Sequence, residues 1–345
     1  MRNKTIFNIV VVLFLILVAG SGTALSQSAE EFYKENMPTI VANGGVGGGT
    51  DFASRIFASY WPDVTGGKPM MAKVMAGSGG IDGLNYVFNA KPDGLTIGIT
   101  HHPSDITVPR LLNLPGPKWD VRKLSWIGLF GQTPQFVVFK KGSNIKTLED
   151  LKALNAKKKL IVGASSIGSS PSLGGSIAIS ILNLDAKIVH GYEAPELALA
   201  IVRGEIDMYV TDGSRVSENM EKGFVEPFTS ITFKRTAWQP KVPAITELVQ
   251  ITPEHKDMIE FMDALEACKS MFGPPGVPAE RLTYLRRSFE KVLQYNGFIK
   301  SIKTNYAVLE PYVTGEDLEK KVNSAVGIAP EKVELVRNLF QKYIK

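Results

Sequence analysis

Short apolar runs recur along the chain, each followed by a loop rich in glycine or serine and then by apolar residues at helical spacing. The first unit has a strand at 39–42, a loop at 44–49 and a helix after it. The second has a strand at 73–75 ahead of the loop 76–80 and another helix. Strands that alternate with helices in this way predict α/β architecture, with parallel strands joined by right-handed crossovers.

The middle of the chain repeats this pattern. A strand at 160–162 leads into the loop 163–171, which is rich in serine, and a helix follows. Further strands are predicted at 125–130, 135–139, 188–192 and 206–210. The last hundred residues are mainly helical, and Cys268 is expected to pack on one of these helices.

The N-terminal residues form a different pattern. Two basic residues precede an unbroken apolar stretch at 9–19, and small and polar residues follow it. This order predicts a secretory signal peptide over residues 1–28, with cleavage open among Ala24, Ser26 and Ser28. The apolar stretch falls short of the ~20 residues that a membrane-spanning helix needs. The chain is therefore expected to be exported.

Composition and charge narrow the function classes. The length of 345 residues predicts two domains. The chain has 39 basic and 34 acidic residues; two of the basic ones lie in the predicted signal peptide, which leaves 37 against 34, or +3. No dense basic cluster occurs beyond 157–159, so nucleic-acid binding is not predicted. The single Cys268 excludes an internal disulfide and a metal site built from several thiolates.

Two loops carry the candidate chemistry. The loops at 44–51 and 163–172 each lead into a helix, where unpaired backbone N–H groups carry partial positive charge. Glycine lets an oxyanion approach the backbone, and serine hydroxyls add donors without adding charge. Ligands of open α/β sheets bind beyond the carboxyl ends of the strands, so these loops predict an anion site. Tight turns and helix caps use the same residues, and that simpler interpretation stays open.

Competing motifs are incomplete. The loop 44–51 lacks both the Gly-Lys-Ser/Thr ending of a nucleotide-binding P-loop and the G-x-G-x-x-G spacing of a dinucleotide site. Neither Ser78 nor Ser165 stands in a full G-x-S-x-G nucleophile elbow. The adjacent His101 and His102 lack the i, i+4 spacing of a helical metal site. No catalytic residue, metal ligand or cofactor is predicted, and the two histidines are candidates for contacting an anion.

Several weak motifs occur in one order along the chain: Val46-Gly47-Gly48-Gly49-Thr50-Asp51, Ala76-Gly77-Ser78-Gly79-Gly80, Lys91-Pro92-Asp93-Gly94-Leu95-Thr96, Gly168-Ser169-Ser170, His190-Gly191-Tyr192 and Arg203-Gly204-Glu205-Ile206-Asp207. In this order and spacing the chain resembles the extracytoplasmic solute receptors of tripartite tricarboxylate transporters, often called Bug proteins. It departs from them at Glu193-Ala194, where a Lys-Gly pair is common in the family. An acidic Glu193 near the cleft would discourage a second ligand carboxylate unless His101 or His102 compensates.

The resemblance implies a two-lobed periplasmic-binding-protein fold of the type II kind. Each lobe is then an α/β sheet flanked by helices, and the lobes close by a hinge on a ligand cleft between them. Lobe 1 would take residues 29–130 and 240–345, and lobe 2 would take residues 131–239. The implied function is that of a monomeric, non-enzymatic periplasmic receptor. It would capture a small organic carboxylate and deliver it to the membrane subunits of a tripartite tricarboxylate-type transporter.

The predicted ligand-binding residues come from these loops and strand ends: Gly47, Gly48, Thr50, Asp51, Ser78, Gly79, His101, His102, Ser165, Ser166, Ser169, Ser170, Tyr192 and Asp212. The glycine and serine loops would hold one carboxylate through backbone N–H groups and hydroxyls, in part through ordered water. An exported α/β enzyme acting on an acyl or phosphate group is the alternative, and it needs a nucleophile, a base and an orienting group together. A receptor for an amide or an amino acid would use the same loops.

Overall fold

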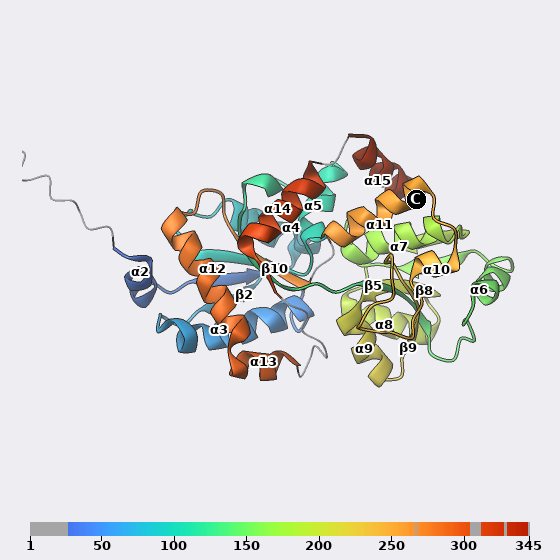
Figure 1. Ribbon diagram of the computed structural model, residues 1–345, viewed down its shortest axis with the longest axis horizontal. Coiled ribbons are helices and arrows are strands. Elements are labelled where there is room, and N and C mark those ends of the chain that lie inside the picture. Colours follow the sequence, from blue (N-terminus) through green and yellow to red (C-terminus); the bar gives the residue numbers. More distant parts are fainter. Residues whose placement is uncertain (1–26, 266–267, 304–311, 328–329, 344–345) are drawn as a thin grey trace, which may run out of the picture.

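The computed structural model describes residues 27–265, 268–303, 312–327 and 330–343. Two β-sheets lie next to each other, each flanked by helices (Figure 1). The predicted signal peptide lies outside the described residues up to residue 26. Within the described ranges, no helix is long and apolar enough to cross a membrane.

The first sheet is built mainly from the N-terminal part of the chain. Its elements, with the helices between them, are α2 (Ala29–Glu35), β1 (Thr39–Ala42), α3 (Gly49–Thr65), β2 (Met71–Val74), η1 (Gly77–Gly80), α4 (Ile81–Phe88), β3 (Thr96–Thr100), α5 (Pro103–Leu111), η2 (Val121–Lys123) and β4 (Ser125–Gly131). The strand order is β11-β4-β10-β3-β1-β2, where β10 (Cys268–Gly273) and β11 (Val313–Thr314) come from the C-terminal part. The neighbours β1, β2 and β3 pair in parallel, as the alternation of strands and helices predicts.

The second sheet is built from the middle of the chain. Its elements are β5 (Gln135–Lys140), α6 (Leu148–Asn155), β6 (Leu160–Gly163), α7 (Ser170–Ile181), β7 (Ala186–Val189), α8 (Ala194–Arg203), β8 (Met208–Asp212), α9 (Gly213–Glu221) and β9 (Val225–Ser230). The strand order is β7-β6-β8-β5-β9, with β6 parallel to both β7 and β8. The predicted α/β architecture, two sheets flanked by helices, is therefore confirmed.

Two predictions about strands need correction. The sheets are mixed rather than fully parallel, because β10 runs antiparallel to β3 and β4, and β5 runs antiparallel to β8 and β9. Cys268 begins a strand, not a helical segment. The strand β10 pairs with residues far away in the chain, and local periodicity carries no signal of such pairing.

The C-terminal helices divide between the two sheets. They are α10 (Ile245–Leu248), α11 (Pro253–Leu265), α12 (Ala279–Gln294), α13 (Asn296–Lys303), α14 (Gly315–Val326) and α15 (Pro330–Tyr343). The helices α12 and α13 pack on α3 of the first sheet, whereas α11 and α15 pack on α7 of the second (Figure 1). Not all of the chain after residue 240 therefore lies with the first sheet, and the lobe boundaries stay a prediction.

Helix ends follow from local sequence. Thr147 accepts a hydrogen bond from the backbone N–H of Asp150 at 3.2 Å, and the Asp150 carboxylate accepts from the N–H of Thr147 at 2.9 Å. This reciprocal capping box starts α6. At the other end of a helix, Gly66 closes α3 with a φ of 63°, a left-handed conformation that glycine adopts without strain.

Aromatic rings cover glycines in the first sheet. Gly98 of β3 pairs with Phe272 of β10, and a methyl group added at Gly98 would lie 2.5 Å from the Phe272 ring. The ring of Phe289 of α12 covers Gly128 of β4 in the same way. A glycine inside a strand marks such a close approach, so the missing side chains leave room for large buried rings.

We expect Gly98→Ala to lower the free energy of unfolding by about 1–3 kcal/mol, because the added methyl group overpacks the Phe272 ring. Urea denaturation measures the change. Phe272→Leu removes the ring and keeps an apolar side chain, so Gly98→Ala should cost less in that background. Equal costs in the two backgrounds would show that the ring is not what excludes the methyl group.

Candidate ligand-binding site

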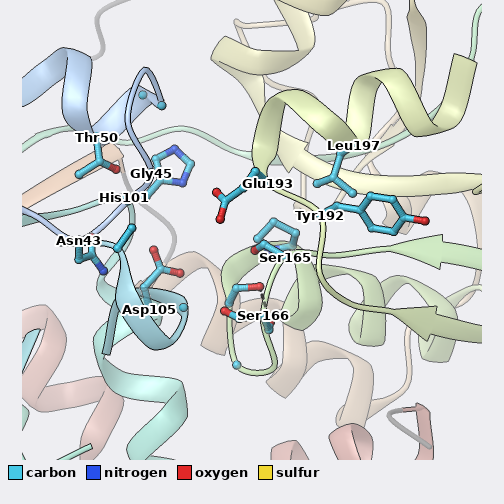
Figure 2. A pocket seen from close by; sticks show the side chains of 18 of the residues that line it. Asn43, Gly45, Thr50, His101, Asp105, Ser165, Ser166, Tyr192, Glu193 and Leu197 are labelled. Carbon is cyan, nitrogen blue, oxygen red and sulfur yellow. Dashed lines mark hydrogen bonds between the residues drawn. The ribbon is translucent and has the colours of Figure 1, made fainter. Parts of the chain in front are cut away.

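A pocket of about 350 Å³ lies between the two sheets, beyond the carboxyl ends of their parallel strands (Figure 2). Its wall contains most of the residues predicted from the sequence: Gly48, Thr50, Ser78, Gly79, His101, Ser165, Ser166, Ser169, Tyr192 and Asp212. Four predicted residues do not line the pocket: Gly47, Asp51, His102 and Ser170. Loops from both sheets thus meet where the topology of an α/β protein places a ligand.

The glycine loop forms one side of the pocket. Gly48 is the N-cap of α3, and Thr50 in the first turn of that helix faces the pocket. Asp51 is 3% exposed, and its carboxylate accepts hydrogen bonds from the Gly47 N–H at 2.9 Å and from Arg55 Nε at 2.6 Å. Gly47 has a φ of 73°, which glycine adopts readily. Asp51 and Gly47 therefore hold the loop in shape, and the N-terminus of α3 faces the pocket.

The serine loop forms the opposite side. Ser165 and Ser166 line the pocket, and Ser169 is the N-cap of α7. The Ser169 hydroxyl donates to the Ser166 carbonyl at 2.6 Å, so it fixes the loop. Ser170, the first residue of α7, is 1% exposed, and its backbone N–H donates to Asp105 Oδ1 at 3.2 Å. The Asp105 carboxylate thus uses one backbone N–H at the N-terminus of α7, where the sequence predicts that a ligand carboxylate binds.

The loop 76–80 reaches across to the serine loop. Ser78 and Gly79 both have positive φ values, 55° and 66°. A methyl group on Gly79 would lie 3.1 Å from Ser166 Cβ, so the two loops touch beside the pocket. A larger residue at position 79 would push the loops of the two sheets apart.

A contact between Asp212 and His101 joins the two sheets at the base of the pocket. Asp212 ends β8 and caps α9, where its Oδ1 accepts from the backbone N–H groups of Ser214 at 2.9 Å and Arg215 at 3.2 Å. Its Oδ2 lies 3.3 Å from His101 Nε2, just beyond the end of β3. This carboxylate therefore ties the ends of two strands from different sheets.

His102 has a supporting role. It is 1% exposed and stands at the N-cap of α5, and its backbone N–H donates to Asp105 Oδ2 at 3.2 Å. Its ring meets the His101 ring edge-on, with centroids 3.9 Å apart. Of the two histidines, only His101 lines the pocket.

The buried charges beside the pocket influence one another. Lys269 of β10 is 1% exposed, and its backbone N–H donates to the His101 carbonyl at 2.6 Å. Burial, followed by the charge of Lys269, lowers the pKa of His101, so the imidazole is neutral at neutral pH. Burial opposes ionisation of Asp212, but its contact with His101 and the charges of Lys269 and His102 hold its pKa well below the usual range. Burial raises the pKa of Asp105.

Donor atoms of His101, His102 and Asp212 lie within 4.8 Å of one another, a spacing that a divalent metal ion could bridge. Lys269 lies close enough to shift the pKa values of both His101 and Asp212. A metal ion there would be repelled by this buried ammonium group. We therefore assign no metal to these residues.

Some pocket residues are absent from the sequence-based prediction. Asp105, Asn43 and Arg215 line the pocket, and the first two are labelled in Figure 2. Asp105 stands at the third position of α5, where an acidic residue in a capping box is a local signal. Glu193, which the sequence marks as a departure from the family pattern, also lines the pocket. Lys269 lacks a local signal, since its burial results from the long-range pairing of β10.

Comparisons with known proteins agree with this geometry. Residues 65–325 match the model of the TctC family, described as tripartite tricarboxylate transporter family receptors. An Agrobacterium vitis protein, the UPF0065 protein of the TAR-I ttuE–ttuC′ intergenic region, is 24% identical over 64% of this chain. That match spans 63% of the relative's own length, which is less than two thirds of it.

Solved structures share the fold. The periplasmic binding protein BugD superposes with a TM-score of 0.70 and 21% identity, over 89% of this chain and 98% of BugD. An R. palustris protein with adipate superposes with a TM-score of 0.71 and 18% identity, over 87% of this chain and 97% of that protein. Family and neighbours are solute-binding proteins, not enzymes. The match over 65–325 shows that this chain belongs to the TctC family of tripartite tricarboxylate transporter receptors.

Proposed function

We propose that this protein is a periplasmic receptor that captures a small organic carboxylate. One observation carries the proposal: the N-termini of α3 and α7, from different sheets, meet at a single pocket lined by glycine and serine. Backbone N–H groups and hydroxyls at helix N-termini hold a carboxylate without a lysine or an arginine. The adipate in the R. palustris structure supports this class of ligand.

Capture would involve closure of two lobes, one built on the first sheet with residues 29–130 and the other on the second sheet with residues 131–239, with the chain after residue 240 divided between them. Two polar contacts join the sheets next to the pocket, His101 with Asp212 and Asp105 with the Ser170 N–H. Opening the lobes would separate both pairs, so these contacts favour the closed arrangement. The helices α11 and α15 add apolar contacts to α7 of the second sheet, and the hinge would have to accommodate them.

Delivery completes the proposed role. A monomeric receptor with a secretory signal peptide would release its ligand to the membrane subunits of a tripartite tricarboxylate-type transporter. Membership of a family of transporter receptors supports this partner.

We expect at least one small carboxylate to stabilise the protein in a thermal-shift screen. The panel contains monocarboxylates, dicarboxylates and amino acids. A ligand that binds only the folded protein adds about 2.7 kcal/mol of stability at a concentration of 100 Kd, which raises Tm by several degrees. Absence of stabilisation across the whole panel would overturn the proposed function.

Ser166→Ala should weaken binding of a carboxylate found in this screen by roughly tenfold, because one hydroxyl donor to a charged group is lost. Hydrogen bonds within the loop run to the Ser166 carbonyl, which alanine retains. Ser180→Ala, in the last turns of the same α7, is the matched control and should leave Kd unchanged. Isothermal titration calorimetry measures both, and equal effects would place the ligand elsewhere.

Asp212→Asn tests the buried contact through pH. The folded-state pKa of Asp212 lies below its unfolded value of about 3.9, so its contribution to stability is full above about pH 5 and is lost as the pH falls. The free energy of unfolding of wild type should therefore exceed that of Asp212→Asn by about 1–3 kcal/mol near pH 7. The difference should be smaller at acid pH.

Denaturant unfolding at several pH values measures this difference. Asp63→Asn, at an exposed position of α3, is the control and should stay within about 0.5 kcal/mol of wild type throughout. A difference between wild type and Asp212→Asn that does not change with pH would argue against an ionised Asp212.

A further inference from the structure

The pocket wall carries more acidic than basic groups. Asp105, Glu193 and Asp212 line it, and the basic side chains on the same wall are His101 and Arg215. Such a balance is unexpected for a site that would hold a ligand with two carboxylates, because like charges in a partly desolvated pocket repel.

Both basic side chains are already engaged with protein carboxylates. Arg215 Nη1 lies 2.6 Å from Glu218 Oε2. His101 Nε2 lies 3.3 Å from Asp212 Oδ2, and burial keeps its imidazole neutral. The sequence allows His101 or His102 to offset the negative charge of Glu193. In the structure, His101 instead contacts Asp212, and His102 does not line the pocket.

The buried acidic groups are partly balanced from behind the wall. The charge of Lys269 acts on both carboxyl groups: it helps to hold the pKa of Asp212 low, and at Asp105 burial outweighs it, so that the pKa of Asp105 is raised. One ammonium group stands there against two carboxylates. The interior of the wall consequently has no positive charge left over for a ligand anion.

Asp105 also removes an anion-binding position. Its two oxygens accept from the N–H groups of His102 and Ser170, so it occupies part of the N-terminal end of α7. Gly48 and Thr50 at the N-terminus of α3 still face the pocket. The geometry leaves space for one ligand carboxylate beside the glycine loop.

Glu193 supplies a negative charge at the mouth of the pocket. It is exposed at the N-cap of α8, and a methyl group built on Gly45 of the opposite loop would lie 3.5 Å from its Oε2. Figure 2 shows its carboxylate directed into the space between the glycine loop and Ser165. Among the residues that the structure describes, no lysine or arginine forms an ion pair with Glu193.

We infer that the ligand is a zwitterionic aminocarboxylate, whose carboxylate binds at the N-terminus of α3 and whose ammonium group faces Glu193. This inference rests on the proposed function and narrows its ligand class. The Glu193 carboxylate attracts an ammonium group and repels a second carboxylate, so the pocket selects between ligands of equal length that differ in the charge of one end.

Matched ligand pairs test the inference by isothermal titration calorimetry. Glutarate is compared with 4-aminobutanoate and adipate with 5-aminopentanoate, since each pair differs only in carboxylate against ammonium at one end. Pentanoate is compared with 2-aminopentanoate for an α-amino group. We expect the best amino member to bind at least about tenfold more tightly than its partner, a difference of about 1.4 kcal/mol.

Glu193→Gln keeps the size of the side chain and removes its charge. The preference for the amino member should fall by about tenfold in this variant, with a gain for the dicarboxylate. Glu221→Gln, at the exposed end of α9, removes a charge away from the pocket and should leave the preference unchanged. Circular dichroism confirms that each variant is folded before titration.

The outcomes separate this inference from the proposed function. If no amino member binds more tightly than its partner, the inference is overturned and a carboxylate receptor is left. A preference for the amino member that survives Glu193→Gln overturns the role of Glu193. Failure of every carboxylate in the panel to bind overturns the proposed function itself.

Discussion

The carboxylate of Asp212 is buried, and its hydrogen-bond donors and counter-charges come from both halves of the molecule. An ionised carboxylate removed from water costs several kcal/mol unless donors and opposite charges surround it. Two of its donors come from the first turn of α9, and its second oxygen faces His101 and feels the charge of Lys269. The ends of β3 and β8 are thereby held together. The loops that follow these and the neighbouring strands then have to face one another across the pocket.

Much of the fold could be predicted from local patterns. Strands β1 and β6 and helices α3 and α7 follow apolar runs, glycine or serine loops and helix-start signals that act over a few positions. The strand β10 could not, because what makes it a strand is pairing with β3 and β4. The same holds for the placement of α11 and α15 on the second sheet, since a helical apolar pattern does not say which sheet it covers. Long-range contacts decide those elements, and one sequence carries little trace of them.

The candidate site divides in the same way. The loops that carry Gly48, Thr50 and Ser166 could be predicted, since a helix that starts directly after a strand has unpaired backbone N–H donors at its first turn. The effect of Asp105 could not: its position in a capping box is visible locally, but its bond to Ser170 joins residues 65 positions apart. Sequence reasoning therefore finds the donors of this pocket more readily than the protein groups that already use them.

Which ligand such a pocket binds depends both on its backbone donors and on the protein groups that already use them. Helix N-termini attract any small anion, so they supply affinity but little discrimination. Discrimination has to come from groups that withdraw donors or add repulsion. Asp105 withdraws the first N–H of α7, and Glu193 places an uncompensated charge across from the glycine loop. Two acidic side chains in these positions would therefore disfavour a second ligand carboxylate by charge repulsion, while the N-terminus of α3 still offers its donors to the first.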